Sequence, residues 1–378
     1  MSHFKQDFLI YVAADQNLYK IEELIPSECK LSTHNLSEGI PDLNQADALI
    51  VRTVSHLNED TFPSPPNQLK FIGTASSGTD HLDNEYLEGK GITLASSNGC
   101  NARTVAEYVM TSLLLWKEKH QPNTPFGKVG VIGVGKAGSA VSELLQDFGI
   151  ECIEYDPPRE EREAEFTSAS LNEVLGAEIL TFHVPFNKKG KYSTFHWLNE
   201  EKLSNRSYKL VINAARGGVI NEIALMKAYV EGRVKNYVLD VWEGEPDFNT
   251  EVAKHAFIAT PHIAGYSEQA KVNATKMICD QMADFFELSS GSLNYQIPPR
   301  TEDLAHIQYD LTKIITRLHP ILGYDKALRD LIGRPDRKVL FRNLRNEWPY
   351  RFEYSSLRIR QGLLDEFPEL KKIGIQGF

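Results

Sequence analysis

Two kinds of segment alternate along most of the chain. Short apolar runs rich in β-branched residues are typical of buried strands, and longer stretches with apolar side chains every three or four positions are typical of helices. The first pattern predicts strands at 8–15, 48–53, 70–76, 128–134, 150–156, 178–184, 209–214, 236–241 and 256–260. Strands that alternate with helices predict an α/β fold with parallel sheets.

Two long helical patterns stand out at 101–120 and at about 267–286. In the first, Val105, Val109, Leu113 and Trp116 recur at helical spacing, and Asn101 is a natural N-cap. The stretch QPNTPFG at 121–127 then breaks the pattern and predicts a hinge, and a Pro-Pro pair at 298–299 marks another boundary.

Composition limits the class of protein. The chain has 378 residues, 42% of them hydrophobic, which is enough for two or three packed domains. A net charge of −10 argues against a protein that coats nucleic acid or an anionic membrane. The 4 cysteines show no C-x-x-C spacing and fit a reducing compartment better than a disulfide framework or a zinc site. Since neither a membrane span nor a signal peptide is recognisable, we expect a cytoplasmic enzyme.

The stretch VGVIGVGKAGSAV at 129–141 contains the pattern G-x-G-x-x-G at Gly133, Gly135 and Gly138. It follows a predicted strand and opens a predicted amphipathic helix, which is the context of a dinucleotide site. The first glycine permits a tight turn, the second lets the backbone approach a pyrophosphate, and the third lets helix and strand pack closely. A glycine-rich turn that binds no ligand is the alternative.

An acidic residue ends the next predicted strand. Asp156 lies 18 residues after Gly138. A carboxylate there can accept hydrogen bonds from both ribose hydroxyls and would repel the 2′-phosphate of NADP. The sequence therefore favours NAD, with a merely solvated acid as the alternative.

Three polar residues further along the chain also follow apolar strands, where open α/β sheets keep their ligand sites. They are Arg216 in INAARGG, Glu245 in LDVWEGEP and His262 in ATPHIAG. Taken singly, each has a structural explanation: a surface cation, a residue that shapes a turn, and a histidine that follows a proline. Their order and surroundings together favour a shared site.

These residues and their surroundings resemble the D-isomer-specific 2-hydroxy acid dehydrogenase family. The resemblance covers about residues 45–290 and is carried by the glycine pattern together with GTASSGTDHLD (73–83), HVP (183–185), NAARGGVIN (213–221), LDVWEGEP (239–246) and ATPHIAGY (259–266). It implies an enzyme that oxidises a 2-hydroxy acid with NAD as cofactor.

The family pattern implies a role for each of the three residues. His262 would take the hydroxyl proton while a hydride leaves the same carbon for nicotinamide. Glu245 would fix the imidazole tautomer and stabilise the imidazolium. Arg216 would bind the substrate carboxylate through two donors and polarise the forming carbonyl.

The resemblance also implies a wider set of contacts. Substrate would be contacted by Thr53, Ser76 and Arg216. NAD would be contacted by Gly133, Gly135, Lys136, Ala137, Gly138, Asp156, Val184, Ala214, Ala215, Asp240, Gly265 and Tyr266. Two of these depart from the family pattern. Thr53 replaces the expected serine and keeps the hydroxyl, whereas Val184 replaces the usual threonine and removes a side-chain contact to the cofactor. We interpret His81 and His183, which also lie in the motifs, as structural.

The family fold is a Rossmann-type doubly wound cofactor domain inserted in a flavodoxin-like α/β substrate domain. We therefore expect a substrate domain at 1–118 and 262–290 and an NAD-binding domain at 119–261, with the two long helices as connectors. The active site would lie in the cleft between these domains, whose closure would exclude water.

The tail at 291–378 differs from the rest of the chain in its net charge. It carries a net charge of +4, against −14 for the first 290 residues. Its stretches HPILGYDKALRDL and FRNLRNEWPYRFEYSSL resemble a small α+β C-terminal dimerisation domain found in one branch of the family. The resemblance implies a homodimer.

That branch acts on a phosphorylated four-carbon 2-hydroxy acid in vitamin B6 biosynthesis, so a second cationic subsite is needed besides Arg216. The candidates are Arg52, Arg103 and the basic stretch 334–360, which holds eight Lys and Arg against three Asp and Glu. The basic stretch is alternatively a solvated or dimer-facing surface.

Two other functions stay open. One is oxidation of 3-phosphoglycerate, which is one carbon shorter and also phosphorylated. The other is a non-enzymatic NAD-sensing binding protein on the same fold. The tail argues against the sensor because it resembles an enzyme's dimerisation domain and contains no long disordered stretch for a partner.

Overall fold

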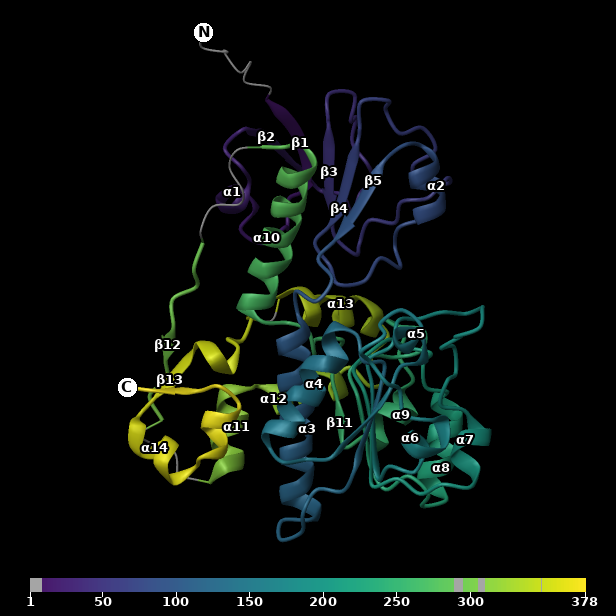
Figure 1. Cartoon of the computed structure of the whole chain (residues 1–378), viewed down its shortest axis with the longest axis vertical. Coiled ribbons are helices and arrows are strands. Elements are labelled where there is room, and N and C mark those ends of the chain that lie inside the picture. Colours follow the sequence, from purple (N-terminus) through teal and green to yellow (C-terminus); the bar gives the residue numbers. More distant parts are fainter. Residues whose placement is uncertain (1–8, 289–294, 305–309, 348) are drawn as a thin grey trace. The chain divides into compact units, whose positions relative to one another are not determined.

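The structure is a computed structural model that describes residues 9–288, 295–304, 310–347 and 349–378. The chain divides into two compact units (Figure 1). Unit 1 comprises Met1–Asn101 and Gln269–Ile297, and unit 2 comprises Ala102–Glu268 and Pro298–Phe378. The sequence placed the corresponding boundaries at 118/119 and 261/262, and its division into substrate, NAD-binding and dimerisation domains stays a prediction.

Unit 1 contains a parallel five-stranded sheet in the order β2-β1-β3-β4-β5. Its strands are β1 (Ile10–Asp15), β2 (Cys29–His34), β3 (Ala48–Val51), β4 (Phe71–Thr74) and β5 (Thr93–Ser96). This strand order is that of flavodoxin-like folds, as the resemblance implied for the substrate domain.

Helices cover both faces of the sheet of unit 1. They are α1 (Ile21–Leu24), α2 (Asn84–Gly89) and α10 (Glu268–Phe285). The first residue of α10, Glu268, belongs to unit 2, and the rest of this helix belongs to unit 1. Ile278 of α10 packs in one hydrophobic cluster with Ile50 and Phe71, and Leu87 of α2 packs in another with Leu49. Because β3 and β4 are buried on both faces, their sequences are mainly apolar, with Thr74 as the one polar residue.

Unit 2 contains a six-stranded parallel sheet in the order β11-β10-β9-β8-β6-β7. Its strands are β6 (Val129–Ile132), β7 (Cys152–Tyr155), β8 (Ile179–Phe182), β9 (Leu210–Asn213), β10 (Tyr237–Leu239) and β11 (Ile258–Ala259). The chain first adds β7 on one side of β6 and then β8 on the other. This reversal makes a topological switch point at the carboxyl ends of β6 and β8, where doubly wound sheets bind ligands.

The helices that accompany this sheet are α3 (Ala102–His120), α4 (Lys136–Asp147), α5 (Pro157–Glu160), α6 (Leu171–Leu175), α7 (Glu200–Ser204), α8 (Glu222–Val230) and α9 (Thr250–His255). The two long helical patterns of the sequence are confirmed as α3 and α10, and each strand of this sheet lies inside the stretch predicted for it. The sequence did not predict β2 and β5, because these edge strands carry exposed polar residues in place of a continuous apolar run.

The C-terminal part of unit 2 forms a small three-stranded sheet with further helices. Its elements are β12 (Arg300–Thr301), α11 (Leu311–Leu318), α12 (Ile321–Arg329), α13 (Arg337–Glu347), a 3₁₀ turn (Tyr354–Ser356), β13 (Leu357–Ile359), α14 (Gln361–Glu366), α15 (Glu369–Lys372) and β14 (Gln376–Gly377). A dimerisation role for this part stays a prediction.

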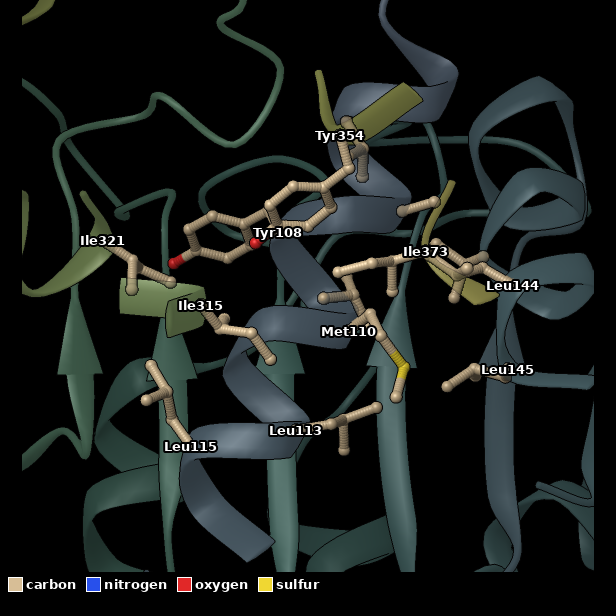
Figure 2. Close-up of a cluster of buried hydrophobic side chains, with 14 of the residues drawn as sticks. Tyr108, Met110, Leu113, Leu115, Leu144, Leu145, Ile315, Ile321, Tyr354 and Ile373 are labelled. Atoms are coloured by element: carbon tan, nitrogen blue, oxygen red, sulfur yellow. The ribbon is translucent and has the colours of Figure 1, made fainter. Parts of the chain in front are cut away.

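This C-terminal part shares a hydrophobic core with the rest of unit 2. Figure 2 shows Ile315, Tyr354 and Ile373 gathered with Tyr108 and Met110 of α3. A buried ion pair also joins the C-terminal part to α3, because Arg351 Nη1 lies 2.7 Å from Glu107 Oε2. The C-terminal segment is therefore anchored to α3 by both apolar and charged contacts.

Candidate active site

The glycine turn lies between β6 and α4, at the switch point of the larger sheet. Gly133 has φ +85°, and a Cβ there would lie 2.8 Å from the backbone nitrogen of Val184. A Cβ at Gly138 would lie only 1.9 Å from the carbonyl oxygen of Gly133, so this glycine lets α4 pack against the turn. Around Gly135, in contrast, nothing comes within 4 Å of such a Cβ. The open face of the turn is therefore at Gly135, as close approach of a pyrophosphate requires.

The first turn of α4 offers donors beside this open face. Lys136 and Ala137 are its first two residues, and the first N–H groups of a helix have no intrahelical acceptor. Together with the positive end of the helix dipole, they suit a phosphate group. The glycine turn and the start of α4 thus fit a bound dinucleotide.

Asp156, which follows β7, is bonded to the same turn. Its Oδ2 accepts the N–H of Val134 at 2.8 Å, and its Oδ1 accepts the N–H of Arg159 at 3.0 Å. Arg159 in turn donates to the carbonyl oxygen of Val134 at 2.8 Å. The carboxylate is thereby held next to the glycine turn, and its oxygens retain lone pairs for the ribose hydroxyls of a cofactor.

His262 and Glu245 form a hydrogen-bonded pair at the carboxyl ends of β11 and β10. The distance from His262 Nδ1 to Glu245 Oε1 is 2.5 Å, and both side chains are partly exposed. Burial would raise the pKa of Glu245, but the nearby His262 lowers it below its usual value, and Arg345 adds to this effect. A carboxylate can only accept a hydrogen bond, so Nδ1 is the donor and Nε2 faces away with its lone pair.

Asp240 holds the backbone that carries His262. It is buried, and it accepts the backbone N–H groups of Ile263 and Ala264, each at 2.8 Å, and the hydroxyl of Thr260 at 2.6 Å. The N–H of His262 donates to the carbonyl oxygen of Asp240 at 2.7 Å. These bonds keep His262 at φ +58°, a backbone conformation that costs a non-glycine residue about 1 kcal/mol or more.

Arg216 follows β9 on a turn shaped by Asn213. The side chain of Asn213 donates to the carbonyl oxygen of Arg216 and accepts the N–H of Ala215, both at 3.1 Å. The guanidinium of Arg216 is partly buried and donates to the carbonyl oxygen of Ala215 at 2.9 Å. Strands β9, β10 and β11 are neighbours in one parallel sheet, so Arg216, Glu245 and His262 all follow carboxyl ends at the same edge.

The loop after β11 continues to Gly265 and Tyr266. The C-terminal part of unit 2 contacts this loop, since Arg345 Nη2 of α13 lies 3.3 Å from the hydroxyl of Tyr266. The sequence did not single out Arg345, although it lies in the basic stretch 334–360. Only the folded chain distinguishes it from the other cations of that stretch.

Thr53 and Ser76 belong to unit 1 and follow β3 and β4. Thr53 is exposed. Ser76 is partly buried, and its hydroxyl donates to the carbonyl oxygen of Gly78 at 2.7 Å and lies 2.9 Å from that of Thr74. Both residues follow carboxyl ends of strands, where a ligand site is expected, and their contact with substrate stays a prediction.

His81 and His183 are held inside the fold. His81 Nε2 lies 2.9 Å from the hydroxyl of Thr74, and His183 Nε2 lies 2.9 Å from that of Thr181. Burial lowers the pKa of His183 to about 3, so its ring stays neutral at neutral pH. Val184 next to it packs its side chain against the glycine turn.

Comparison with known proteins agrees with this geometry. Residues 105–264 match the family described as "D-isomer specific 2-hydroxyacid dehydrogenase, NAD binding domain". The erythronate-4-phosphate dehydrogenase of Bacteroides thetaiotaomicron is 38% identical over 84% of this chain and 89% of its own. That of Proteus mirabilis is 35% identical over 92% and 94%, respectively. The chain belongs to the erythronate-4-phosphate dehydrogenases of the D-isomer-specific 2-hydroxyacid dehydrogenase family.

Solved structures extend the likeness to the fold. The D-lactate dehydrogenase of Aquifex aeolicus, solved with NAD and lactic acid, superposes with a TM-score of 0.56 and 26% identity. The match covers 73% of this chain and 95% of the other. Membership of this family makes the protein an NAD-dependent oxidoreductase. Among the helices that the structure describes, none combines the length and apolar character that crossing a membrane requires.

Proposed function

We propose that the protein oxidises 4-phospho-D-erythronate to (R)-3-hydroxy-2-oxo-4-phosphobutanoate with NAD, a step of pyridoxal 5′-phosphate biosynthesis. The relatives that bear the name erythronate-4-phosphate dehydrogenase support this substrate, because they match 84% to 92% of the chain and not only its cofactor-binding part. The observation that carries the chemistry is the 2.5 Å hydrogen bond between His262 and Glu245.

The proposed reaction begins with proton removal by His262. Its Nδ1 is occupied by the Glu245 carboxylate, so its Nε2 is the atom that accepts the proton of the C2 hydroxyl. The pair then stabilises the imidazolium, because Glu245 supplies a negative charge at hydrogen-bonding distance. Bound NAD supplies the acceptor for the hydride that leaves C2.

Arg216 is the proposed anchor for the substrate carboxylate. Its planar guanidinium can donate two parallel hydrogen bonds to a carboxylate and place the adjacent carbonyl for polarisation. Thr53 and Ser76 complete the proposed substrate contacts. For NAD, we propose the glycine turn, Lys136 and Ala137 at the pyrophosphate and Asp156 at the ribose, with Val184, Ala214, Ala215, Asp240, Gly265 and Tyr266 nearer the nicotinamide.

The decisive experiment follows NADH formation by the purified protein on 4-phospho-D-erythronate and on 3-phosphoglycerate. We expect a higher kcat/KM on the four-carbon substrate. We expect His262→Gln and Arg216→Ala to be severely impaired, while His255→Gln, a change at an exposed histidine ending α9, keeps wild-type activity. A preference for 3-phosphoglycerate would overturn the substrate assignment.

The same preparation tests the sensor alternative. If the wild type is inert on every 2-hydroxy acid, while NAD changes its association with another protein, the sensor function replaces the enzymatic one. We also propose that the protein acts as a homodimer in the cytoplasm. Sedimentation should therefore give twice the 42.7 kDa mass of the chain.

A further inference from the structure

A substrate that carries a carboxylate and a phosphate needs two cationic subsites. Arg216 is proposed for the carboxylate, which leaves the phosphate without an assigned partner. Two arginines suggested by the sequence are already engaged. Arg52 is paired with the buried Asp15 at 2.9 Å. Arg103 bonds both Glu107 at 3.1 Å and the carbonyl oxygen of Ile373 at 2.5 Å.

Most cations of the basic stretch 334–360 are also paired with acids or exposed. The paired ones are Arg334 with Asp336, Arg337 and Lys338 with Asp247, Arg351 with Glu107, and Arg360 with Asp303. Arg342 and Arg358 are exposed. Arg345 differs from all of these, because it is partly buried and forms no ion pair with the acids that the structure describes.

The guanidinium of Arg345 lies against Tyr266, four residues after His262. Its centre is 5.9 Å from the centroid of the Tyr266 ring, and Nη2 lies 3.3 Å from the tyrosine hydroxyl. The Nε atom of Arg345 is buried and has no hydrogen-bond partner among the described residues. A buried donor without a partner is costly, and an anion that enters the site would remove this cost.

The charge of Arg345 acts directly on the proposed catalytic pair. Burial would lower the pKa of Arg345, but Tyr266 and Glu245 raise it above its ordinary value. Reciprocally, Arg345 helps to lower the pKa of Glu245. The guanidinium is therefore close to the pair yet leaves hydrogen-bond donors unused.

We propose that Arg345 binds the phosphate group of the substrate, so that α13 of the C-terminal part supplies the phosphate subsite (Figure 1). This inference rests on the proposed function. The arginine is suited to the role because it can give a phosphate two parallel charge-assisted hydrogen bonds. The C-terminal part of the chain would then determine substrate specificity in addition to packing against α3.

The test compares Arg345→Met with wild type on 4-phospho-D-erythronate and on unphosphorylated D-erythronate. The matched control is Arg342→Met, which removes an exposed arginine one turn away on the same helix. We expect Arg345→Met to raise KM for the phosphorylated substrate about 10- to 100-fold, the range for loss of hydrogen bonds to a charged group. The kcat/KM on D-erythronate should fall by a much smaller factor than that on 4-phospho-D-erythronate, since only the effect on Glu245 remains, and the KM for NAD should stay within about twofold of wild type.

A conservative variant separates charge from geometry. Arg345→Lys keeps the charge but not the planar pair of donors, so its KM should lie between those of wild type and Arg345→Met. If kcat/KM falls by the same factor on both substrates and its pH profile shifts, Arg345 is a positioning residue for Glu245 and the inference is overturned. A raised KM for NAD with unchanged preference for the phosphorylated substrate would overturn it in favour of a cofactor contact.

Failure of the proposed function is distinguishable from failure of this inference. If the wild type does not oxidise 4-phospho-D-erythronate, the function fails. The subsite is then tested by calorimetric titration of the NAD-bound protein with inorganic phosphate. Binding that is lost in Arg345→Met and kept in Arg342→Met supports the subsite, and equal binding by all three proteins refutes it.

Discussion

Gly217 lies directly against the carbonyl oxygen of Trp242. A Cβ at Gly217 would lie 1.9 Å from that oxygen and 3.0 Å from the backbone nitrogen of Glu243. The loop after Arg216 and the loop that leads to Glu245 therefore pack backbone to backbone. The indole N–H of Trp242 donates to the carbonyl oxygen of Thr260 at 2.9 Å, and Thr260 lies between β11 and His262. These contacts hold together the segments that carry Arg216, Glu245 and His262.

Replacing Gly217 with alanine should therefore reduce activity. The added methyl group must push the two loops apart, and a displacement of about 1 Å at an active site can cost about 100-fold in rate. We expect kcat/KM to fall by about that factor. Gly362→Ala is the control, because nothing lies within 4 Å of a Cβ at Gly362. A Gly217→Ala protein with the wild-type rate would contradict the tight packing of these loops.

Glu245→Gln should lower kcat without weakening NAD binding. The glutamine can still contact His262 but cannot supply the negative charge that stabilises the imidazolium, so we expect a loss of roughly 100-fold or more. Steady-state kinetics and NADH fluorescence titration measure the two quantities. Glu243→Gln is the matched control, because Glu243 lies two residues earlier and contacts His196 at 2.9 Å instead. Equal losses in both variants would argue against a specific role for Glu245.

The buried Glu222 should make stability depend on pH. Burial raises the pKa of Glu222 from its ordinary value of 4.5 to about 7, although its carboxylate accepts the N–H of Glu243 at 2.6 Å. The native state holds this proton more tightly than the unfolded chain, so the stabilisation is full below about pH 4.5 and is lost as pH rises to about 7.

The shift corresponds to about 3 kcal/mol. In urea titrations, the free energy of unfolding of the wild type should fall by up to about 3 kcal/mol between pH 5 and pH 8, compared with that of Glu222→Gln. Glu143→Gln, a change at an exposed residue of α4, should follow wild type at both pH values. Parallel pH dependences of wild type and Glu222→Gln would show that this carboxyl does not titrate differently on folding.

Breaking the buried ion pair between Arg351 and Glu107 should destabilise unit 2. The side chains are 4% and 0% exposed, and burial raises the pKa of Glu107. Arg351→Met leaves the buried Glu107 carboxylate with Arg103 as its remaining charge partner and should cost about 3 kcal/mol, the lower end of the range for breaking a buried pair. The double variant with Glu107→Leu should recover much of this loss. Lys254→Met, which breaks an exposed pair with Glu251, should cost less than about 1 kcal/mol.

Asp156→Ser should relax the preference for NAD over NADP. The change removes the negative charge that would repel the 2′-phosphate and the acceptor for the ribose hydroxyls. We expect kcat/KM for NAD to fall and that for NADP to rise, changing their ratio by roughly tenfold or more. Glu165→Ser, a change at a nearby exposed acid, should leave the ratio unchanged. An unaltered ratio in Asp156→Ser would move the discrimination to another residue.

Local sequence patterns predicted much of the fold. The strands buried on both faces, such as β3 and β6, read as mainly apolar runs because their side chains pack into the hydrophobic core. The edge strands β2 and β5 were not predicted because their residues are exposed or partly buried, so their sequences lack an apolar run. Helix α13 shows the same limit in the tail, since its sequence indicated only a basic surface while its structure turns Arg345 towards Tyr266.

The sequence by itself determined the fold class, the family, the glycine turn and the three polar residues that follow β9, β10 and β11. These features depend on local spacing, which the chain carries whatever its tertiary contacts. Only the tertiary structure decided that His262 Nδ1 meets Glu245, that Asp240 supports the His262 loop, and that Arg345 is a partly buried cation without an ion pair to the described acids. Such pairings join residues up to 79 positions apart, as Tyr266 and Arg345 are, and depend on which side chains the packed core brings together.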